Sequence, residues 1–498
     1  VPAKSILLLA FNRKAREQMI QKLAQKNLPV EKRLDDRGVA VHTFHSFGHC
    51  YLREALRGWE VESDAGFWAG FLGNVINETG HPIISRRYQD PLADYFRAIE
   101  RVRRDLEPPD SVLVELTDLR GDPILPFTIQ PVLEAYHRRQ IEVVKFNFDD
   151  QIYLTLKHLL ENPLWRQKFQ RRFEHILVDE FQDLNAAQLA LIDILTRPQW
   201  SLYAVGDDDQ MIYGWRGAQV SHILDFPERH AMSKTVTLNI NYRCSQEVIR
   251  RSSWVISHNT QRHPKTVTPR PNAKPGYFQI KFGEGLHTEA EEAVSFLKRS
   301  KERLGCAWRD LAVLCRYNAQ QPIVALALDQ HNIPRTPLLT YKLFTSTPGN
   351  VLRGYLGTVL NPEQSNGEDL RYILKHPNLF LKNELIDWIV KGSPPWSRIE
   401  DLLQQPNQEI TNSAPGNLEK FRSKILNLHA QASRLSAEAL MDRIVISFDL
   451  RKHFTKLTDS QDLDFDKVTD EHLMDILVDI SRDYPTPNEF HTFLCGQS

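Results

Sequence analysis

The sequence predicts an α/β protein with mostly parallel sheets and helical insertions. Short apolar runs at residues 6–10, 176–178 and 202–205 have the pattern of strands buried on both faces of a parallel sheet. Segments with apolar residues at helical spacing alternate with these runs, which is typical of a sheet covered by helices. A chain of 498 residues is too long for one ordinary core, so we expect several domains.

The predicted elements of the first half form one core that a helical segment interrupts. A strand at Ile6–Ala10 precedes a helix from Arg13 to Gln25, and a second strand at Val39–His42 leads into another helix. Residues 60–145 have a helical pattern, so we interpret them as an insertion between core strands. The core then resumes with the two later apolar runs.

The second half begins as another α/β unit at residues 238–243. Its pattern predicts strands at Tyr277–Phe282 and Leu311–Arg316, each followed by a helix, at 289–303 and at 319–331. After these elements the chain has a helical pattern to its end. The predicted segments are residues 1–59, 60–145, 146–235, 236–362 and 363–498.

Composition excludes several classes of protein. No apolar run approaches the ~20 residues needed to cross a bilayer, and no signal peptide is visible, so we expect a cytoplasmic protein without a membrane partner. The five cysteines are scattered without a C-x-x-C pair, which argues against a zinc site, an iron–sulfur cluster or a disulfide framework.

Charge by itself points to no partner, because the net charge is −1. Basic residues nevertheless cluster at 86–104 and 166–172, and acidic residues gather at 459–479. A solvated helix face is the simpler explanation of any one cluster. The uneven distribution of basic and acidic residues along the chain therefore permits a basic nucleic-acid path but does not establish one.

Two carboxylates follow a predicted buried strand. Asp179 and Glu180 come directly after the run at 176–178, and sites in parallel sheets lie at the carboxyl ends of the strands. There Asp179 would hold Mg²⁺, and Glu180 would orient and deprotonate an attacking water. Many strands end in acidic residues, so a purely structural pair is the alternative.

The loop after the next strand combines an amide with aromatic residues. Gln210 follows three aspartates, and an uncharged amide there would contact a γ-phosphate or the water attacking it. Tyr213 and Trp215 would stack on bases at roughly 1–3 kcal/mol per base, and Arg216 would add phosphate or stacking contacts. A core position for Trp215 is the alternative, although a glycine-flanked Tyr-x-Trp-Arg in a polar loop is poor core patterning.

Three other positions suit phosphate chemistry. Arg243 opens the second unit and would act as an arginine finger across a cleft, or else be an ordinary surface arginine. Thr43, His45 and Ser46 stand at a strand-to-helix turn, where they would contact a DNA backbone, cap the helix, or do both. Residues 12–14 stand at the preceding strand-to-helix junction, and the same two roles, a DNA-backbone contact or a helix cap, apply to them.

These segments, taken in this order, resemble the motifs of superfamily 1 DNA helicases of the UvrD/Rep/PcrA type. The similar segments are residues 9–15, 43–47, 178–183, 205–218 and 238–243, with weaker similarity up to residue 362. The resemblance implies P-loop-NTPase-like (RecA-like) domains with helical insertions. It assigns 1–59 and 146–235 to domain 1A, 60–145 to 1B, 236–362 to the first part of 2A, and 363–498 to an incomplete 2B.

The resemblance also implies an ATP-dependent 3′→5′ helicase that uses Mg²⁺ and moves along single-stranded DNA up to single-strand/duplex junctions. It implies Asp179 and Glu180 for Mg²⁺ and water, Gln210 as γ-phosphate sensor and Arg243 as finger. The implied DNA-binding residues are Phe11, Asn12, Arg13, Thr43, Phe44, His45, Tyr213, Trp215 and Arg216.

The sequence departs from the family pattern in one important respect. A G-x-x-x-x-G-K-[ST] loop is expected roughly twenty residues before Ile6, and no glycine in the printed sequence is followed by lysine. Motifs V and VI are also missing from it. We therefore expect a segment of a helicase that is inactive alone. The alternatives are a non-catalytic DNA-binding or scaffolding protein derived from a helicase, and a chain whose phosphate loop comes from a partner.

Overall fold

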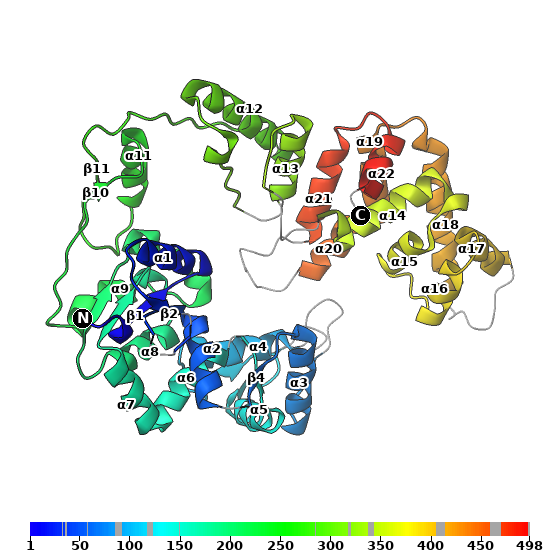
Figure 1. Cartoon of the computed structure of the whole chain (residues 1–498). Helices are drawn as coiled ribbons and strands as arrows, with labels where there is room; N and C mark the ends of the chain where they lie inside the picture. The colour runs from blue at the N-terminus through cyan, green and yellow to red at the C-terminus, as the bar shows by residue number, and fades with distance from the viewer. Residues whose placement is uncertain are drawn as a thin grey trace. The chain divides into compact units, whose positions relative to one another are not determined.

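The computed structural model divides the chain into two compact units, Val1–Phe278 and Gln279–Ser498, which are described separately (Figure 1). Arg86, Arg87, Asp149 and residues 459–469 are among those outside the described part of the chain. The described residues are 1–31, 33–34, 37–56, 58–84, 92–116, 123–148, 150–283, 285–316, 320–336, 343–404, 414–458 and 470–496.

A five-stranded sheet forms the centre of the first unit, with the strand order β2-β3-β1-β8-β9. All four of its pairings are parallel, which confirms the predicted parallel sheet. The strands are β1 (Ile6–Ala10), β2 (Val30–Glu31), β3 (Val39–Thr43), β8 (His175–Val178) and β9 (Leu202–Ala204).

Helices pack against this sheet and bury its apolar side chains. Phe47 of α2 lies at the middle of an aromatic cluster, with ring centroids 6.1 Å from Phe169 and 6.4 Å from Tyr51, and all three side chains are fully buried. The helices are α1 (Arg13–Gln25), α2 (Phe44–Ala55), α6 (Asp150–Glu161), α7 (Pro163–Arg172), α8 (Ala186–Thr196), α9 (Ser221–Leu224) and α10 (Phe226–Arg229).

The segment predicted as a helical insertion has its own core around Trp68, Leu72 and Tyr136. Its first and last residues lie side by side, because Glu60 pairs with Lys145 in a short parallel ladder. Two short strand pairs accompany the expected helices. The elements are β4 (Glu60–Val61), α3 (Ala65–Glu78), α4 (Ala93–Arg104), β5 (Leu113–Val114), β6 (Phe127–Thr128), α5 (Gln130–Val143) and β7 (Lys145–Phe146).

The last part of the first unit contains β10 (Ile240–Asn241), α11 (Gln246–Ile256) and β11 (Thr268–Pro269). The two strands pair in parallel, with Ile240 opposite Thr268. The compact unit thus extends to Phe278, beyond the predicted segment boundary at residue 236.

The strands predicted at 277–282 and 311–316 are wrong, because the described residues there form no strand. A strand requires a neighbouring strand that pairs its backbone N–H and C=O groups, and neither run belongs to a sheet formed by the described residues. Several of their apolar side chains are exposed, with Phe282 at 92% and Leu314 at 94%. Apolar patterning alone does not show whether a neighbouring strand is present.

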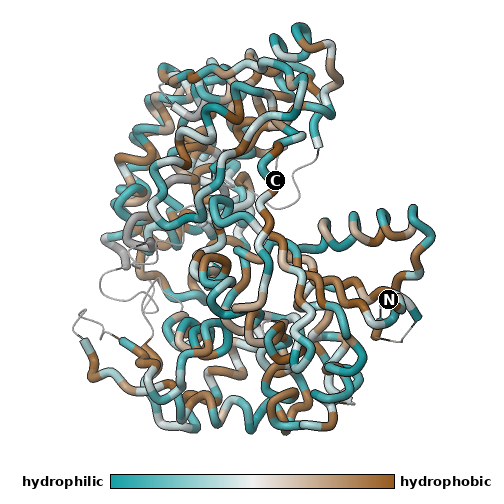
Figure 2. The backbone as a smooth tube through the Cα atoms, turned by 90° about the vertical axis from the view of Figure 1, so that its left-hand side faces the viewer, coloured by the Kyte–Doolittle hydropathy of each residue, from teal (hydrophilic) through white to brown (hydrophobic). Residues whose placement is uncertain are grey.

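The second unit is helical. Hydrophobic and hydrophilic residues are interspersed along the helices of the chain (Figure 2). α14 lies in the core of this second unit, where Tyr355 is fully buried and α15, α18, α21 and α22 contact the helix. The helices are α12 (Leu286–Leu304), α13 (Gln321–Gln330), α14 (Thr347–Leu360), α15 (Gly367–Lys375), α16 (Asn383–Val390), α17 (Pro395–Gln404), α18 (Ala414–Ala432), α19 (Ala437–Ser447), α20 (Leu450–Thr458), α21 (Asp470–Ser481) and α22 (Pro487–Gly496).

The helices predicted at 289–303 and 319–331 correspond to α12 and α13, although residue 319 lies outside the described part of the chain. Among the described residues, no helix combines the length and apolar character that crossing a bilayer requires.

Candidate functional site

Parallel register brings the chain segments of the candidate site to one edge of the sheet. Leu9 of β1 lies opposite both His42 of β3 and Val178 of β8. The backbone N–H of Asp179 donates to Leu9 O (3.1 Å), and that of Val205 donates to Val178 O (2.9 Å). The residues that follow β1, β3, β8 and β9 therefore emerge together at the carboxyl ends of the strands.

The two carboxylates after β8 are in an electrostatically unfavourable arrangement. Burial, followed by the charge of Glu180, raises the pKa of Asp179, and the same two causes raise the pKa of Asp183 to about 6. Glu180 itself has a left-handed backbone conformation (φ 53°), which is uncommon for a residue other than glycine. A bound divalent cation would offset this repulsion, and carboxylate oxygens are ligands that Mg²⁺ prefers, so the residues fit that ion.

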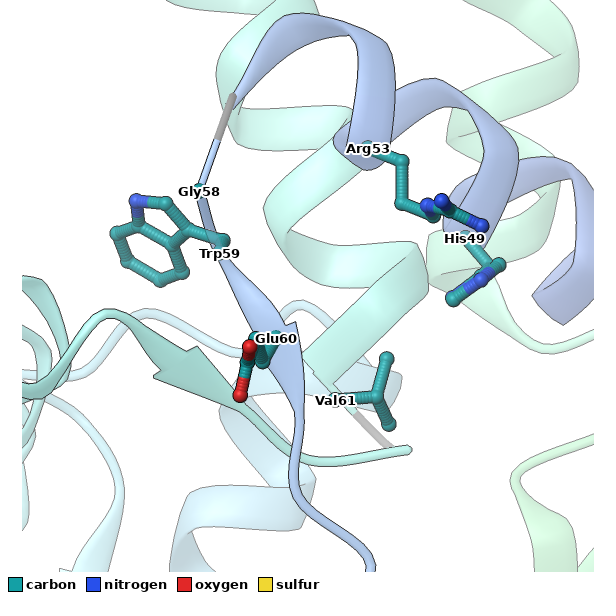
Figure 3. A pocket seen from close by; sticks show the side chains of 6 residues that line it. All are labelled: His49, Arg53, Gly58, Trp59, Glu60 and Val61. Carbon is teal, nitrogen blue, oxygen red and sulfur yellow. The ribbon is translucent and has the colours of Figure 1, made fainter.

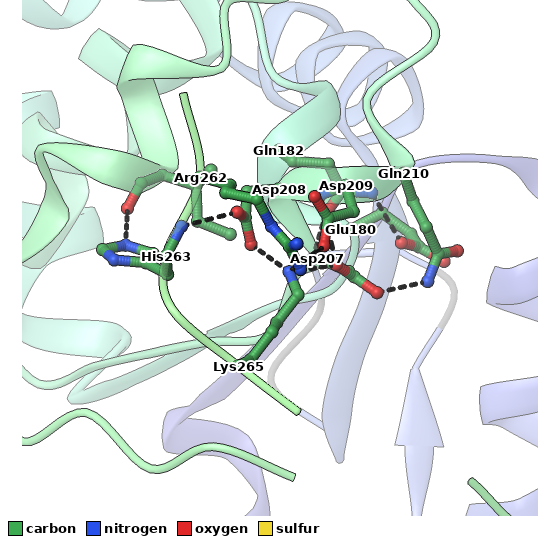
Figure 4. Close-up of polar contacts among 10 residues, drawn as sticks. Glu180, Gln182, Asp207, Asp208, Asp209, Gln210, Arg262, His263 and Lys265 are labelled. Atoms are coloured by element: carbon green, nitrogen blue, oxygen red, sulfur yellow. Dashed lines mark hydrogen bonds and ion pairs between the residues drawn. The ribbon is translucent and has the colours of Figure 1, made fainter. Parts of the chain in front are cut away.

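A hydrogen-bonded chain connects Glu180 to Gln210 (Figure 4). Gln182 Nε2 donates to Glu180 Oε2 (2.9 Å), and the backbone N–H of Asp207 donates to Gln182 Oε1 (3.0 Å). Gln210 Nε2 in turn donates to Asp207 Oδ2 (2.6 Å). The two segments predicted to carry the chemistry are thus connected through the buried amide of Gln182, which the sequence had not marked as a connecting residue.

Glycine at position 206 allows this connection. A Cβ there would lie 2.7 Å from Gln182 Oε1 and 2.8 Å from Ile223 Cδ1, closer than real Cβ contacts. The absence of a side chain at position 206 therefore lets the backbone that follows β9 approach Gln182 closely without displacing either neighbouring side chain.

The three aspartates before Gln210 form ion pairs with a basic segment that precedes β11. Lys265 Nζ lies 2.6 Å from Asp207 Oδ1 and 3.0 Å from Asp209 Oδ2, and it also contacts Asp208 Oδ1. Arg262 Nη2 pairs with Asp209 Oδ2 at 2.8 Å. The carboxylates are close enough together to hold a metal ion, but the lysine ammonium already lies among them.

The aromatic residues beyond Gln210 gather at the surface. Tyr213 lies 4.8 Å from Phe11 and 6.3 Å from Trp215 between ring centroids. The guanidinium of Arg216 lies 4.5 Å from the centroid of the Trp215 ring. Trp215 is 49% exposed, which excludes the alternative that it is a core residue.

Residues at the starts of α1 and α2 cap these helices, as the simpler interpretation predicted. Asn12 Oδ1 accepts from the backbone N–H of Ala15 (2.8 Å), and Thr43 forms a reciprocal capping box with Ser46. Arg13, the first residue of α1, has an exposed side chain.

His45 and Phe44 have different environments. His45 stacks on Phe148, with ring centroids 4.5 Å apart, and burial followed by Arg216 and Arg13 lowers its pKa to about 4. The imidazole is therefore neutral at pH 7. The side chain of Phe44 is 1% exposed and packs in the core, so the DNA contact predicted at this residue could come only from its backbone.

Arg243 follows β10 with an exposed side chain. Its backbone N–H donates to Asn241 Oδ1 (2.9 Å), so Asn241 fixes the turn that leads to it. Within the described residues, this guanidinium forms no ion pair.

The described arginines at the end of α4, which belong to the first arginine cluster, are paired with carboxylates. Arg103 is buried against Asp150 (2.5 Å), and Arg101 pairs with Glu107. Arg104 pairs with Asp105 (2.9 Å) and donates to the backbone carbonyl of Trp215 (3.3 Å). The end of α4 thus contacts the aromatic loop, a contact that the sequence pattern did not indicate.

Two described pockets lie elsewhere. The first, of about 450 Å³, is formed by the end of α2 and by β4 (Figure 3). Its lining contains none of the predicted site residues, and neither does that of the second pocket, of about 730 Å³, between α6, α7 and α8. The candidate site at the carboxyl edge of the sheet is thus separate from both of these pockets.

Comparisons with known proteins identify relatives. The family model for the UvrD/REP helicase N-terminal domain matches residues 116–231, and the model for the UvrD-like helicase C-terminal domain matches residues 236–474. ATP-dependent DNA helicase PcrA of Staphylococcus epidermidis is 31% identical over 364 residues, which is 72% of this chain and 48% of the relative. The helicases of the same name from Leuconostoc citreum and Staphylococcus aureus are each 27% identical, covering 67% and 72% of this chain and 44% and 47% of the relatives. The chain spans about half the length of these curated relatives.

Proposed function

This chain belongs to the UvrD/Rep/PcrA-type superfamily 1 helicases, and on that premise we propose that it is part of an ATP-dependent helicase moving 3′→5′ along single-stranded DNA. The observation that carries the proposal is the hydrogen-bonded chain from Glu180 through Gln182 and Asp207 to Gln210. The exposed cluster around Trp215 follows directly along the same loop. Carboxylates for hydrolysis and aromatics for bases are therefore parts of one connected structure.

The carboxyl edge of the sheet is proposed as the place of hydrolysis. Mg²⁺-ATP, when bound, supplies the phosphoanhydride bond whose hydrolysis releases free energy. Asp179 would provide ligand oxygens for the ion, and Glu180 would accept the proton of the attacking water. Gln182 holds one oxygen of Glu180 at 2.9 Å and thereby orients this carboxylate. Arg243 would neutralise charge on the γ-phosphate.

Gln210 is proposed to connect the two ends of the loop. Its carboxamide is exposed and donates to Asp207, so it could change partner when a γ-phosphate is present. Two residues separate it from Tyr213, whose ring lies 4.8 Å from that of Phe11 in a tilted arrangement. A change in the position of Gln210 would therefore be transmitted to the aromatic cluster through a few covalent bonds.

The DNA path is proposed to follow the exposed residues of the same edge. Trp215 and Tyr213 would stack on bases, while Arg13 and Arg216 would contact phosphates. Asn12 and Thr43 would act through the helix N-termini that they cap, because the remaining backbone N–H groups there favour phosphate. The proposed partners are single-stranded DNA and its junctions with duplex DNA, in the cytoplasm.

The test combines DNA binding with ATP hydrolysis by the 498-residue polypeptide. We expect it to bind an oligothymidylate with an affinity that falls as salt rises. We also expect no DNA-stimulated hydrolysis, because the backbone amides and lysine of a G-x-x-x-x-G-K-[ST] loop are not in this sequence. The control is Glu180→Gln, which should bind DNA as the unaltered chain does.

The possible outcomes separate the proposals. Failure to bind single-stranded DNA would contradict the proposed function itself. Turnover that Glu180→Gln abolishes would contradict the expected inactivity but support the assigned chemistry. Sequencing the flanking DNA decides the remaining alternative: an in-frame phosphate-loop sequence upstream supports a helicase, and its absence between intact start and stop signals supports a non-catalytic DNA-binding protein.

A further inference from the structure

Lys265 is surrounded by carboxylates in a place that little water reaches (Figure 4). Its side chain is 12% exposed, and those of Asp208 and Asp209 are 4% and 8% exposed. Burial opposes the charge of Lys265, but its hydrogen bonds to the three carboxylates outweigh this effect and raise its pKa. The lysine therefore stays charged at neutral pH and serves as the counter-ion of the cluster.

The cluster depends on this counter-ion. One carboxylate oxygen from each of Asp207, Asp208 and Asp209 lies within 4.8 Å of the other two. Asp209 also pairs with Arg262 at 2.8 Å, and Asp208 accepts from the backbone N–H of residue 263 at 2.8 Å. Without the ammonium, three negative charges would share one guanidinium in a poorly solvated space, which is strongly unfavourable.

One carboxylate connects Lys265 to the candidate site. Asp207 Oδ1 lies 2.6 Å from Lys265 Nζ, and Asp207 Oδ2 accepts from Gln210 Nε2 at 2.6 Å. Lys265 thus fixes the carboxylate that fixes Gln210. Because the backbone N–H of Asp207 donates to Gln182, the same residue is also connected to Glu180.

Lys265 also lies close in sequence to the strand pair, β10 and β11, that precedes Arg243. Three residues after the lysine, Thr268 pairs with Ile240, and Arg243 follows β10 two residues beyond its end. Three residues of extended chain span at most about 10 Å. Because the segment between Lys265 and β11 is so short, a displacement of β10 and β11 would also displace Lys265.

We propose that Lys265 is a positioning residue that ties the Gln210 loop to the strand pair carrying Arg243. It would keep the γ-phosphate sensor and the arginine finger in a fixed relation, so that movement of either is transmitted to the other. The roles of Gln210 and Arg243 rest on the proposed function, whereas the tether itself rests on the contacts of Lys265.

Hydrogen exchange without DNA or nucleotide tests the tether. In Lys265→Ala we expect the peptide covering residues 205–217 to exchange about tenfold faster or more, while the peptide covering β8 is unchanged. Lys265→Arg keeps the charge and should restore most of the protection. Lys274→Ala removes an exposed lysine from the same segment and should exchange like the unaltered chain.

Two results would overturn the proposal: unchanged exchange at 205–217 in Lys265→Ala, or faster exchange spread equally over β1 and β8. If Lys265→Ala does not fold, Asp207→Asn replaces it, because the lysine keeps two carboxylates while its link to Gln210 is weakened. Faster exchange at 205–217 in Asp207→Asn supports the tether, and unchanged exchange contradicts it.

Single-strand affinity tests whether the tether matters for the proposed function. We expect Lys265→Ala to weaken oligothymidylate binding three- to tenfold, and to have no further effect in a Trp215→Ala background, because both act through one loop. Additive losses would contradict this coupling. If the unaltered chain does not bind DNA, the proposed function fails, while hydrogen exchange still decides whether the tether exists.

Discussion

Replacing Trp215 with alanine is expected to weaken binding of single-stranded DNA by about 1–2 kcal/mol, or roughly 5- to 30-fold. The structure sets the size of this effect. Stacking of one base on an aromatic ring contributes roughly 1–3 kcal/mol, but Arg216 lies over the Trp215 ring at 4.5 Å and leaves one face for a base. The loss should therefore fall in the lower part of that range.

The chain offers a closely matched control for this substitution. Trp388 in the second unit is 42% exposed, and the guanidinium of Arg398 lies 4.6 Å from its ring centroid. Trp388→Ala thus removes a similar exposed indole under a similar cation. We expect it to leave the affinity for a short oligothymidylate unchanged.

Fluorescence anisotropy at several salt concentrations measures both affinity and its salt dependence. Trp215→Ala removes a stacking contact, so the slope of log K against log salt should not change. Arg216→Ala removes a phosphate contact and should reduce that slope by about 0.7 for a single strand. Equal affinity losses in Trp215→Ala and Trp388→Ala, or full affinity in Trp215→Ala, would refute the placement of Trp215 on the DNA path.

Two further predictions concern stability. Gly206→Ala should lower the free energy of unfolding by about 1–3 kcal/mol, because its Cβ would collide with Gln182 Oε1, whereas Gly214→Ala meets nothing within 4 Å and should have little effect; equal urea midpoints for the two variants would contradict this reasoning. Burial, followed by nearby arginines, lowers the pKa of His42 and His45 from 6.5 to about 4, so the unfolded chain binds these protons more tightly. These two rings should therefore destabilise the fold as pH falls from 6.5 towards 4, whereas the raised pKa of Asp183 acts in the opposite direction. The difference in urea midpoint between the unaltered chain and a variant with His42→Gln and His45→Gln cancels the contribution of Asp183, and a difference that stays constant over this range would contradict the expected neutral state of both rings.

The sequence predicted the parallel sheet well because its strands are buried on both faces, and such strands consist almost entirely of apolar residues. The same kind of pattern failed at 277–282 and 311–316, because pairing depends on a second segment and not on the strand's own composition. Local apolar patterning therefore identifies the tendency to form a strand, while the neighbour decides whether the strand forms.

The candidate site was predicted in part for a similar reason. Asp179, Gln210 and Trp215 were recognisable because each belongs to a short motif in an unusual position. Lys265 was not, because its role arises from contacts with aspartates more than fifty residues earlier in the chain. A basic Arg-His-Pro-Lys segment after an Asp-Asp-Asp loop was the one available signal, and charge complementarity across such a separation is weak evidence without a structure.

The pairing of Glu60 with Lys145 has a consequence for protein engineering. Neighbouring strands lie about 4.8 Å apart, so a linker of one or two residues could join the two ends of the insertion without displacing the sheet. The segment between them is in this respect a removable cassette.

Removal of this segment would nevertheless leave a buried carboxylate in the remaining chain without two of its partners. Asp150, which is fully buried in α6, would lose Arg103 and Gln140, two of its partners. A shortened chain would therefore need an uncharged residue at position 150. The insertion can be removed at its ends, but its polar contacts with α6 couple its sequence to that of the core.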